Sequence, residues 1–241
     1  MESEETSFTY PAEWSVPGGE VHTFAPRVHR FCLLIPVINE GQRIVDQLAR
    51  VQVLNPSVDV IVVDGGSTDG SNKPELQRGL GVRTLLIKRD RGKLSAQLRM
   101  GMAYALSQGY EGIITVDGNG KDDVSAVPAF VAALASGAEF VQGSRFVRGG
   151  QAVNTPVSRH LAITLIHAPV VSLAARKRYT DTTNGFRGHS ARLLQDPQVA
   201  PFRDVFNSYE LLAYLPIRAS RLGYECREIP VTRAYPEDEV P

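Results

Sequence analysis

Acidic, amide and glycine residues gather in two short segments, each directly after an apolar run. Asp64–Gly70 (DGGSTDG) follows Val58–Val63, and Asp117–Asp123 (DGNGKDD) follows a second such run. A carboxylate at a strand end can accept a hydrogen bond from a base or a ribose, and glycine lets the backbone approach a ligand closely. Carboxylate and amide oxygens also suit Mg²⁺ or Mn²⁺ when a substrate supplies phosphate oxygens. We therefore expect a nucleotide site, with Asp117 and Asn119 within reach of a divalent cation.

Both segments also have structural interpretations. Asp64–Gly70 can be a tight turn capped by Asp and Ser side chains, and it is not a phosphate-binding P-loop because the GxxxxGK[ST] pattern is absent. Asp122 and Asp123 fit the N-cap of a helix expected over Ser125–Ala135. We favour a functional role for Asp117 and a capping role for the other two carboxylates.

The elements that must position these residues alternate along the chain. Short apolar runs predict strands, and the stretches between them carry apolar residues at the three- and four-residue spacing of helices. Such alternation indicates an α/β fold with a mostly parallel sheet covered by helices on both faces. Ligands of such sheets bind beyond the carboxyl ends of the strands, where the polar segments fall. The strands are expected over Phe31–Ile35, Val58–Val63, Val82–Ile87, Gly112–Val116 and Phe140–Gln142, and the helices over 43–53, 94–107 and 125–135.

Composition narrows the class of protein. Of the 241 residues, 43% are apolar and 22% charged, and 26 basic residues balance 26 acidic ones. This excludes a disordered tail, a collagen-like repeat and a coiled coil, and zero net charge does not indicate a nucleic-acid-binding protein. Cys32 and Cys226 lie far apart, as expected of reduced core thiols in a cytoplasmic protein. Residues 1–30 show little apolar periodicity, which predicts an irregular N-terminal arm.

Several ordered motifs together resemble family 2 glycosyltransferases of the GT-A fold, and later motifs resemble the branch of polyprenyl-phosphate (dolichyl-phosphate) sugar synthases. The similarity covers residues 31–235 and implies a single GT-A domain over 31–241. Its first half, 31–124, would bind the nucleotide, and 125–241 would face the acceptor. The motifs are PVINE at 36–40, VVDGGSTDG at 62–70, VDGN at 116–119, GSRF at 143–146, SR at 158–159, DTTNGFR at 181–187 and EIPV at 228–231.

The resemblance implies an inverting transfer of a sugar from a UDP- or GDP-sugar. The acceptor would be a polyprenyl phosphate or a glycan intermediate in cell-envelope polysaccharide synthesis. A lipid phosphate is already an anion and needs no general base, whereas an alcohol acceptor needs one. Two other classes stay open at this point. One is a sugar nucleotidyltransferase, although this sequence lacks the phosphate loop rich in glycine and basic residues that such enzymes carry. The other is a non-catalytic protein that binds nucleotide sugars.

The same resemblance assigns residues to a site that would use Mg²⁺ or Mn²⁺. Arginines suit the phosphate of the acceptor or of the leaving diphosphate because a guanidinium binds phosphate oxygens in a fixed fork. The assigned residues are Pro36, Asn39, Glu40, Asp64, Gly66, Lys93 and Asp117 for the nucleotide, Asp117 and Asn119 for the metal, Arg145, Arg159 and Arg187 for phosphate, and Asp117, Arg145 and Glu210 for catalysis.

Some positions depart from the family pattern or have structural alternatives. Asn119 stands where the family carries a second acid; its carbonyl can ligate a cation but brings no charge, so we expect weaker metal affinity, for which Asp122 could compensate. Glu210 could simply be a helix-end carboxylate paired with an arginine. Arg187 could brace the turn Asp181–Arg187 instead of binding phosphate.

One apolar stretch raises the question of a membrane. Leu161–Ala175 is followed by three basic residues, 176–178, and fifteen residues are too few to span a bilayer. It could lie at the inner membrane surface beside anionic lipid, or it could be a buried helix with a solvated basic end. His160, His167 and His189 are scattered, and we interpret them as structural or surface residues.

Overall fold

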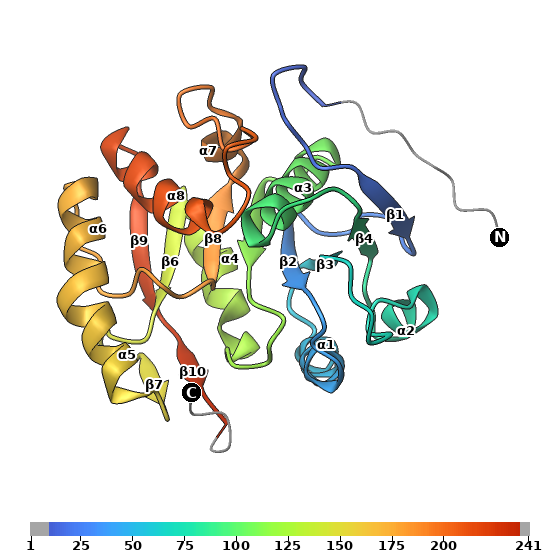
Figure 1. Ribbon diagram of the computed structural model, residues 1–241, viewed down its shortest axis with the longest axis horizontal. Coiled ribbons are helices and arrows are strands. Elements are labelled where there is room, and N and C mark those ends of the chain that lie inside the picture. The colour runs from blue at the N-terminus through green and yellow to red at the C-terminus, as the bar shows by residue number, and fades with distance from the viewer. Residues whose placement is uncertain (1–9, 237–241) are drawn as a thin grey trace.

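A mostly parallel sheet forms the centre of the computed structural model, which describes residues 10–236; the parts of the expected arm and domain at 1–9 and 237–241 lie outside the described residues. The strands are β1 (Gly19–Thr23), β2 (Phe31–Val37), β3 (Asp59–Asp64), β4 (Thr84–Lys88), β5 (Gly112–Thr115), β6 (Phe140–Ser144), β7 (Gln151–Val153), β8 (Arg187–Ser190), β9 (Cys226–Pro230) and β10 (Thr232–Ala234). The large sheet has the order β1-β4-β3-β2-β5-β8-β6-β9, and a small sheet pairs β10 with β7 (Figure 1). In the large sheet, β1 and β8 run antiparallel to their neighbours and the other strands share one direction.

Helices cover both faces of the sheet, as predicted. Strand β2 is buried on both sides because Leu34 packs into the cluster beneath α3 while Leu33 packs into the cluster beneath α1. Helices α3, α7 and α8 share the first apolar cluster, and α1 and α4 share the second. The helical elements are α1 (Gln42–Leu54), α2 (Pro74–Gly79), α3 (Leu94–Ser107), η1 (Val124–Ala126), α4 (Val127–Ala135), α5 (Val157–Ala162), η2 (Ile163–His167), α6 (Ala168–Ala175), α7 (Ala191–Gln195) and α8 (Glu210–Arg221).

The part of the expected irregular arm that the structure describes is held by the domain. All the predicted strands are found, as β2 to β6, but β1 adds an edge strand paired with β4. Farther upstream, the ring of Trp14 stacks on Phe202 at 4.0 Å, and the N–H of Ser15 donates to the carbonyl of Phe202 at 2.8 Å. The sequence pattern missed β1 because an exposed five-residue edge strand carries little apolar periodicity.

Strand β8 brings the turn at 181–187 to the edge of the sheet where the polar loops lie. It is inserted between β5 and β6 and runs antiparallel to both. Thr115 Oγ1, on β5, donates to the carbonyl of Gly185 at 2.9 Å, and the N–H of Gly143, on β6, donates to that of Phe186 at 2.9 Å. The turn is therefore fixed between the carboxyl ends of the two strands.

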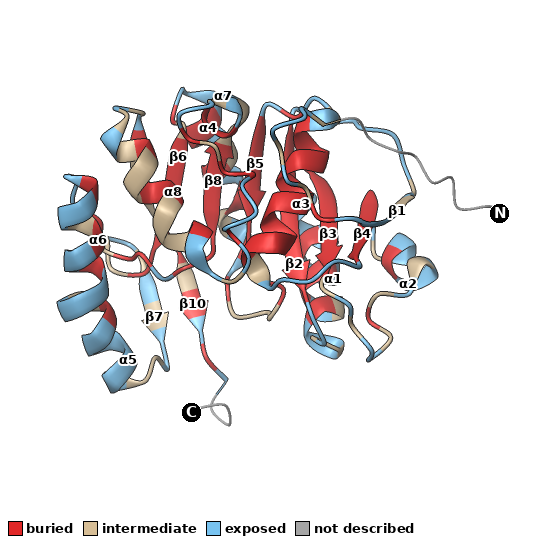
Figure 2. Ribbon diagram, turned by 45° about the horizontal axis from the view of Figure 1, so that its top comes forward, coloured by how far each residue is buried: buried red, intermediate tan, exposed pale blue. Residues whose placement is uncertain are grey.

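The predicted apolar stretch is part of a longer helix. Elements α5, η2 and α6 follow one another without a break over Val157–Ala175, 19 residues. By length and composition this helix could cross a membrane, as could the core helix of many soluble proteins. Here, however, only 17% of its apolar 18-residue stretch is buried. Figure 2 shows α5 and α6 at one edge of the molecule with a largely exposed outer surface. The exposed large apolar side chains of this helix are Val157, Leu161, Leu165, Ile166, Val170 and Leu173.

The close contact between α3 and the sheet gives a test of the fold. A Cβ added at Gly101 would lie 2.7 Å from Val63 Cγ2 and still closer to Leu34 Cδ1. We expect Gly101→Ala to lower the free energy of unfolding in urea by about 1–3 kcal/mol, because the extra methyl overpacks the core. The control is Gly79→Ala in α2, where a Cβ meets nothing within 4 Å; it should be neutral or stabilising by up to ~1 kcal/mol. A Gly101→Ala protein as stable as the wild type would contradict this packing.

Candidate active site

The loops that follow β2 and β3 are joined by hydrogen bonds into one rim. Asn39, in the left-handed region with φ 52°, donates its N–H to Ser67 Oγ at 2.9 Å and accepts the N–H of Thr68 at Oδ1, at 2.8 Å. The N–H of Gly41 donates to Asp69 Oδ2 at 2.7 Å. The two predicted nucleotide segments thus form a single surface, and the side chain of Asn39 helps to brace it.

Asp64 acts first as the cap of its own turn. Its Oδ1 accepts the N–H groups of Gly66 and Ser67, both at 2.8 Å, and the side-chain amide of Asn72 at 3.0 Å. Its Oδ2 is buried and has no hydrogen-bond partner among the residues that the structure describes. Gly66 has φ 99° and open space around it. The structure therefore shows the turn-capping role of Asp64, with one carboxylate oxygen left over.

Two other predicted nucleotide contacts differ in their exposure. Pro36 lies inside β2 and is buried, so it offers little surface to a nucleotide. Glu40 is half-buried, with Oε2 at 2.9 Å from Arg43 Nε. Burial raises the pKa of Glu40, Arg43 opposes that shift, and the charge of Asp117 adds to it. Glu40 therefore lies near the acidic loop that follows β5.

Lys93 and Glu210 are connected through the segment that precedes α8. The N–H of Lys93 donates to the carbonyl of Asn207 at 2.6 Å, and the N–H of Ser95 donates to that of Ser208 at 2.7 Å. Glu210 is exposed, and its Oε2 accepts the N–H of Ser208 at 2.7 Å. Burial raises the pKa of Glu210, but hydrogen bonds from backbone N–H groups outweigh this and lower it. Glu210 is thus a helix-end carboxylate bound to the backbone.

The acidic loop after β5 faces a cation that the sequence analysis did not identify. Arg233, on β10, places Nη1 3.2 Å from Asp117 Oδ2 and in direct contact with Asp122 Oδ2. Burial raises the pKa of Asp122, and Arg233 opposes that shift. Asp123 caps η1 by accepting the N–H of Ser125 at 3.0 Å. The predicted cap at Asp123 is confirmed, and that at Asp122 is wrong because its carboxylate turns toward β10.

The oxygen atoms of this loop suit a divalent cation that a substrate helps to bind. The Asp117 side chain is 28% exposed, and Asn119 Oδ1 accepts the N–H of Lys121 at 3.2 Å. Within residues 10–236, no group of three His, Cys, Asp or Glu side chains could hold a metal ion. The Asp122 side chain is fully buried against Arg233, whereas that of Asp117 is partly exposed, so Asp122 is not free to compensate. One carboxylate and one amide therefore fit Mg²⁺ or Mn²⁺ that takes further ligands from phosphate and water.

A pocket of about 670 Å³ beside this loop brings together two of the predicted phosphate-binding arginines. Arg145 is buried; its Nε and Nη2 donate to the two carboxylate oxygens of Asp181 at 2.6 and 2.9 Å. Arg159 enters the lining from α5, and Arg233 from β10. Apolar side chains of the long helix form another part of the wall: Ala162, Ile163 and Ile166.

Arg187 is not part of this pocket. It is buried, and its guanidinium donates to three backbone carbonyls: Nε to Asn184 at 2.9 Å, Nη2 to Thr182 at 2.9 Å and Nη1 to Leu212 at 2.6 Å. The prediction that Arg187 binds phosphate is therefore wrong. Its donors stabilise the turn at 181–187 and connect that turn to α8, as the structural alternative proposed.

His167 does lie at the pocket, in the π-helical turn η2. Its Nδ1 is 2.6 Å from Thr182 Oγ1, so it connects the long helix to the turn at 181–187. Burial and the charge of Arg187 lower its pKa, which favours the neutral imidazole. Single π-helical turns often occur at functional sites because they redirect side chains.

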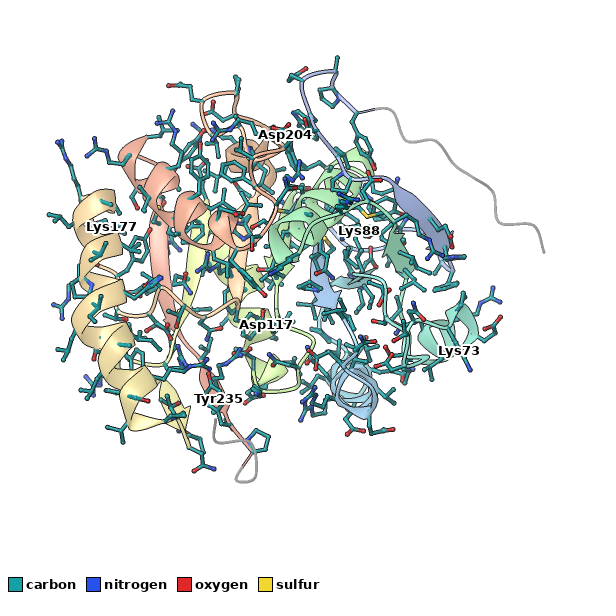
Figure 3. The ribbon with its side chains drawn as sticks, viewed as in Figure 1. Lys73, Lys88, Asp117, Lys177, Asp204 and Tyr235 are labelled. Atoms are coloured by element: carbon teal, nitrogen blue, oxygen red, sulfur yellow. The ribbon has the colours of Figure 1, made fainter. Side chains whose placement is uncertain are left out.

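Tyr235, just after β10, is the second residue that the sequence analysis missed. Three cations lie over its ring: Lys121 at 4.9 Å, Arg159 at 5.5 Å and Arg233 at 5.8 Å from the centroid. Arg159 Nη1 also donates to its hydroxyl at 2.7 Å. Burial raises the pKa of Tyr235, but these arginines outweigh burial and lower it. Figure 3 shows Asp117 near the centre of the molecule and Tyr235 below it. The available signal was the two-residue spacing of Arg233 and Tyr235, which puts both on one face of a strand.

Comparison with known proteins supports the predicted family. The model of Glycosyl transferase family 2 matches residues 32–201. The undecaprenyl-phosphate mannosyltransferase of Micrococcus luteus is 27% identical over 205 residues, which cover 84% of this chain and 83% of the relative. The polyprenol monophosphomannose synthase of Mycolicibacterium smegmatis is 26% identical over 225 residues, which cover 92% of this chain and 84% of the relative.

Solved structures share the fold. Glucosyl-3-phosphoglycerate synthase from Mycobacterium tuberculosis, in complex with Mn²⁺, UDP and phosphoglyceric acid, has a TM-score of 0.62 at 20% identity, over 88% of this chain and 73% of that one. Its complex with Mn²⁺, UDP-glucose and phosphoglyceric acid has a TM-score of 0.63 at 18% identity, over 88% and 74%. The predicted GT-A fold is confirmed. The chain belongs to glycosyl transferase family 2, and it is a glycosyltransferase.

Proposed function

We propose that this protein transfers a sugar from a UDP- or GDP-sugar to the phosphate of a polyprenyl phosphate, with inversion at the anomeric carbon. The names of the two relatives support the acceptor class. The observation that carries the proposal is the composition of the 670 Å³ pocket, where arginines meet the apolar side of an exposed helix. A lipid phosphate has the same two parts, an anionic head and an apolar chain.

The lining of the pocket contains both kinds of group that such an acceptor needs. Arg145, Arg159 and Arg233 bring three guanidinium groups to the lining, and a guanidinium keeps its charge and binds phosphate oxygens directionally. Ile163 and Ile166 border the same pocket, and the helix that carries them continues along an exposed apolar surface. The isoprenoid chain would follow this surface while its phosphate stays at the arginines.

The donor would lie against the rim formed by the loops after β2 and β3, with its diphosphate toward Asp117. Asp117 and Asn119 would hold Mg²⁺ or Mn²⁺, and the cation would neutralise charge on the leaving diphosphate. The acceptor phosphate is itself the nucleophile, so the chain has only to position it and exclude water. Glu210 is bound to the backbone and does not line the arginine pocket, which favours a phosphate acceptor over an alcohol.

We further propose that the protein is cytoplasmic and contacts the inner face of the membrane through its long helix. Leu165, Val170 and Leu173 are exposed on α5–α6, and the helix ends at the exposed basic residues Arg176–Arg178. An exposed apolar helix with basic residues at its end suits the boundary between acyl chains and anionic headgroups. Figure 3 shows Lys177 at the outer edge of the molecule, next to α6.

Transfer itself is tested with undecaprenyl phosphate, Mn²⁺ and a set of UDP- and GDP-sugars, followed by chromatography of the lipid product. We expect Asp117→Asn to lower the rate about a hundredfold, because the leaving diphosphate loses electrostatic support. The matched control, Asp46→Asn on the exposed face of α1, should leave the rate unchanged. Absence of a lipid product with every donor would overturn the proposed function.

Tyr235→Phe tests the placement of the acceptor phosphate. The variant keeps the ring that Lys121 and Arg233 approach but loses the hydroxyl that Arg159 contacts. We expect KM for the lipid phosphate to rise about fivefold, the effect of one net hydrogen bond of ~1 kcal/mol, with KM for the donor unchanged. Tyr224→Phe, which loses a hydroxyl bonded to Asp196, is the control and should change neither constant. An unchanged acceptor KM in Tyr235→Phe would contradict this placement.

Membrane contact is measured by co-sedimentation with vesicles that contain phosphatidylglycerol. We expect the double variant Leu165→Asp/Leu173→Asp to bind at least about tenfold more weakly, because each leucine loses an apolar transfer energy of ~1.5–3 kcal/mol. Val53→Asp is the control, since Val53 is 86% exposed on α1, a helix outside the long apolar one. Equal binding by both variants would rule out α5–α6 as the contact.

A further inference from the structure

Arg233 lies against the residues that the sequence assigns to a divalent cation. Its Nη1 is 3.2 Å from Asp117 Oδ2 and also contacts Asp122 Oδ2. Arg233 is only 8% exposed, and the Asp122 side chain is fully buried. A guanidinium in this position already satisfies the carboxylate that a metal ion would use.

The backbone holds Arg233 in this place. The N–H of Asp123 donates to the carbonyl of Thr232 at 3.0 Å, and the N–H of Ala234 donates to that of Lys121 at 2.8 Å. Hydrogen bonds on both sides of Arg233 thus attach β10 to the acidic loop, and the backbones of Asp122 and Arg233 form an isolated antiparallel β-bridge. Backbone pairing with the acidic loop therefore fixes the position of the Arg233 guanidinium.

The charges of the loop point the same way. Asn119 is neutral where the family pattern has a second acid, and Lys121 adds a positive charge two residues later. Asp117 and Asp122 both contact Arg233, so the charge that would attract a divalent ion is largely balanced by the chain itself. Arg233 also lines the arginine pocket, so it lies between the acidic loop and the phosphate site.

We propose that Arg233 is a resident counter-cation of Asp117, which competes with the divalent ion and itself attracts the diphosphate of the nucleotide. This inference rests on the proposed function for the identity of the diphosphate ligand. It has two consequences that oppose each other. Without Arg233 the free protein binds Mn²⁺ more tightly, because Asp117 is released, and it binds a nucleoside diphosphate more weakly when no metal is present.

The experiment measures both consequences on the full chain. Mn²⁺ binding without nucleotide is followed by the electron paramagnetic resonance signal of the free ion, and binding of UDP and of GDP in EDTA is followed by calorimetry. Arg233→Met leaves the Asp122 carboxylate buried without its partner and can unfold the protein. A second comparison is therefore made between Asp122→Asn and Asp122→Asn/Arg233→Met, because both of these variants lack the Asp122 charge. Thermal unfolding checks that each variant is folded.

We expect loss of Arg233 to raise Mn²⁺ affinity about tenfold and to lower nucleotide affinity in EDTA about tenfold, the scale of one charge-assisted contact. Arg233→Lys keeps the positive charge but lacks the paired N–H donors of a guanidinium, so both of its affinities should lie between those of the wild type and of Arg233→Met. Unchanged Mn²⁺ affinity, or no Mn²⁺ binding by any variant, overturns the competition. Unchanged nucleotide affinity in EDTA overturns the contact with the diphosphate. If the wild type binds neither nucleotide even with Mn²⁺, the proposed donor fails, and the Mn²⁺ measurement alone still decides the competition.

Discussion

The ion pairs of Arg233 with Asp117 and Asp122 join β10, the last strand of the described chain, to the loop after β5, and the geometry of the site depends on them. Removing one partner of a buried pair typically costs about 3–5 kcal/mol, because the other charge stays buried without compensation. The strand that carries Arg233 also positions Tyr235, and Tyr235 in turn gathers Lys121 and Arg159. These ion pairs and Tyr235 therefore link the acidic loop, the long helix and the end of the described chain.

A second buried ion pair, Arg145 with Asp181, contributes to the same pocket. The side chains of Arg145 and Asp181 bind each other through two hydrogen bonds, and Glu228 on β9 accepts the N–H groups of Thr180 and Asp181. The guanidinium groups are thus oriented before a ligand arrives. Preorganised charges of this kind stabilise an anion without the reorganisation that mobile side chains would need. An apolar helix beside such a charged site gives one pocket both cationic and apolar lining.

Much of this arrangement could be predicted from the sequence. The parts that could not be predicted all have the same cause. Strands β2 to β6 follow from apolar runs, and Asp117 and Arg145 follow from family motifs that come directly after two of these strands. Arg187 belongs to a motif as well, but its side chain turns inward to backbone carbonyls. A motif identifies a residue type at a position, whereas burial decides which of its partners a guanidinium meets.

The sequence by itself determined the fold class, the family and the edge of the sheet at which the site lies, because apolar periodicity and motif order are properties of neighbouring residues. Tertiary structure alone decided which charges meet. Arg233 contacts Asp117 across 116 positions of the chain, and Arg159 contacts Tyr235 across 76. No local pattern encodes such contacts, since they exist only after β10 packs against the loop and the long helix packs beside it. The chemistry of the pocket is therefore a consequence of packing between distant segments.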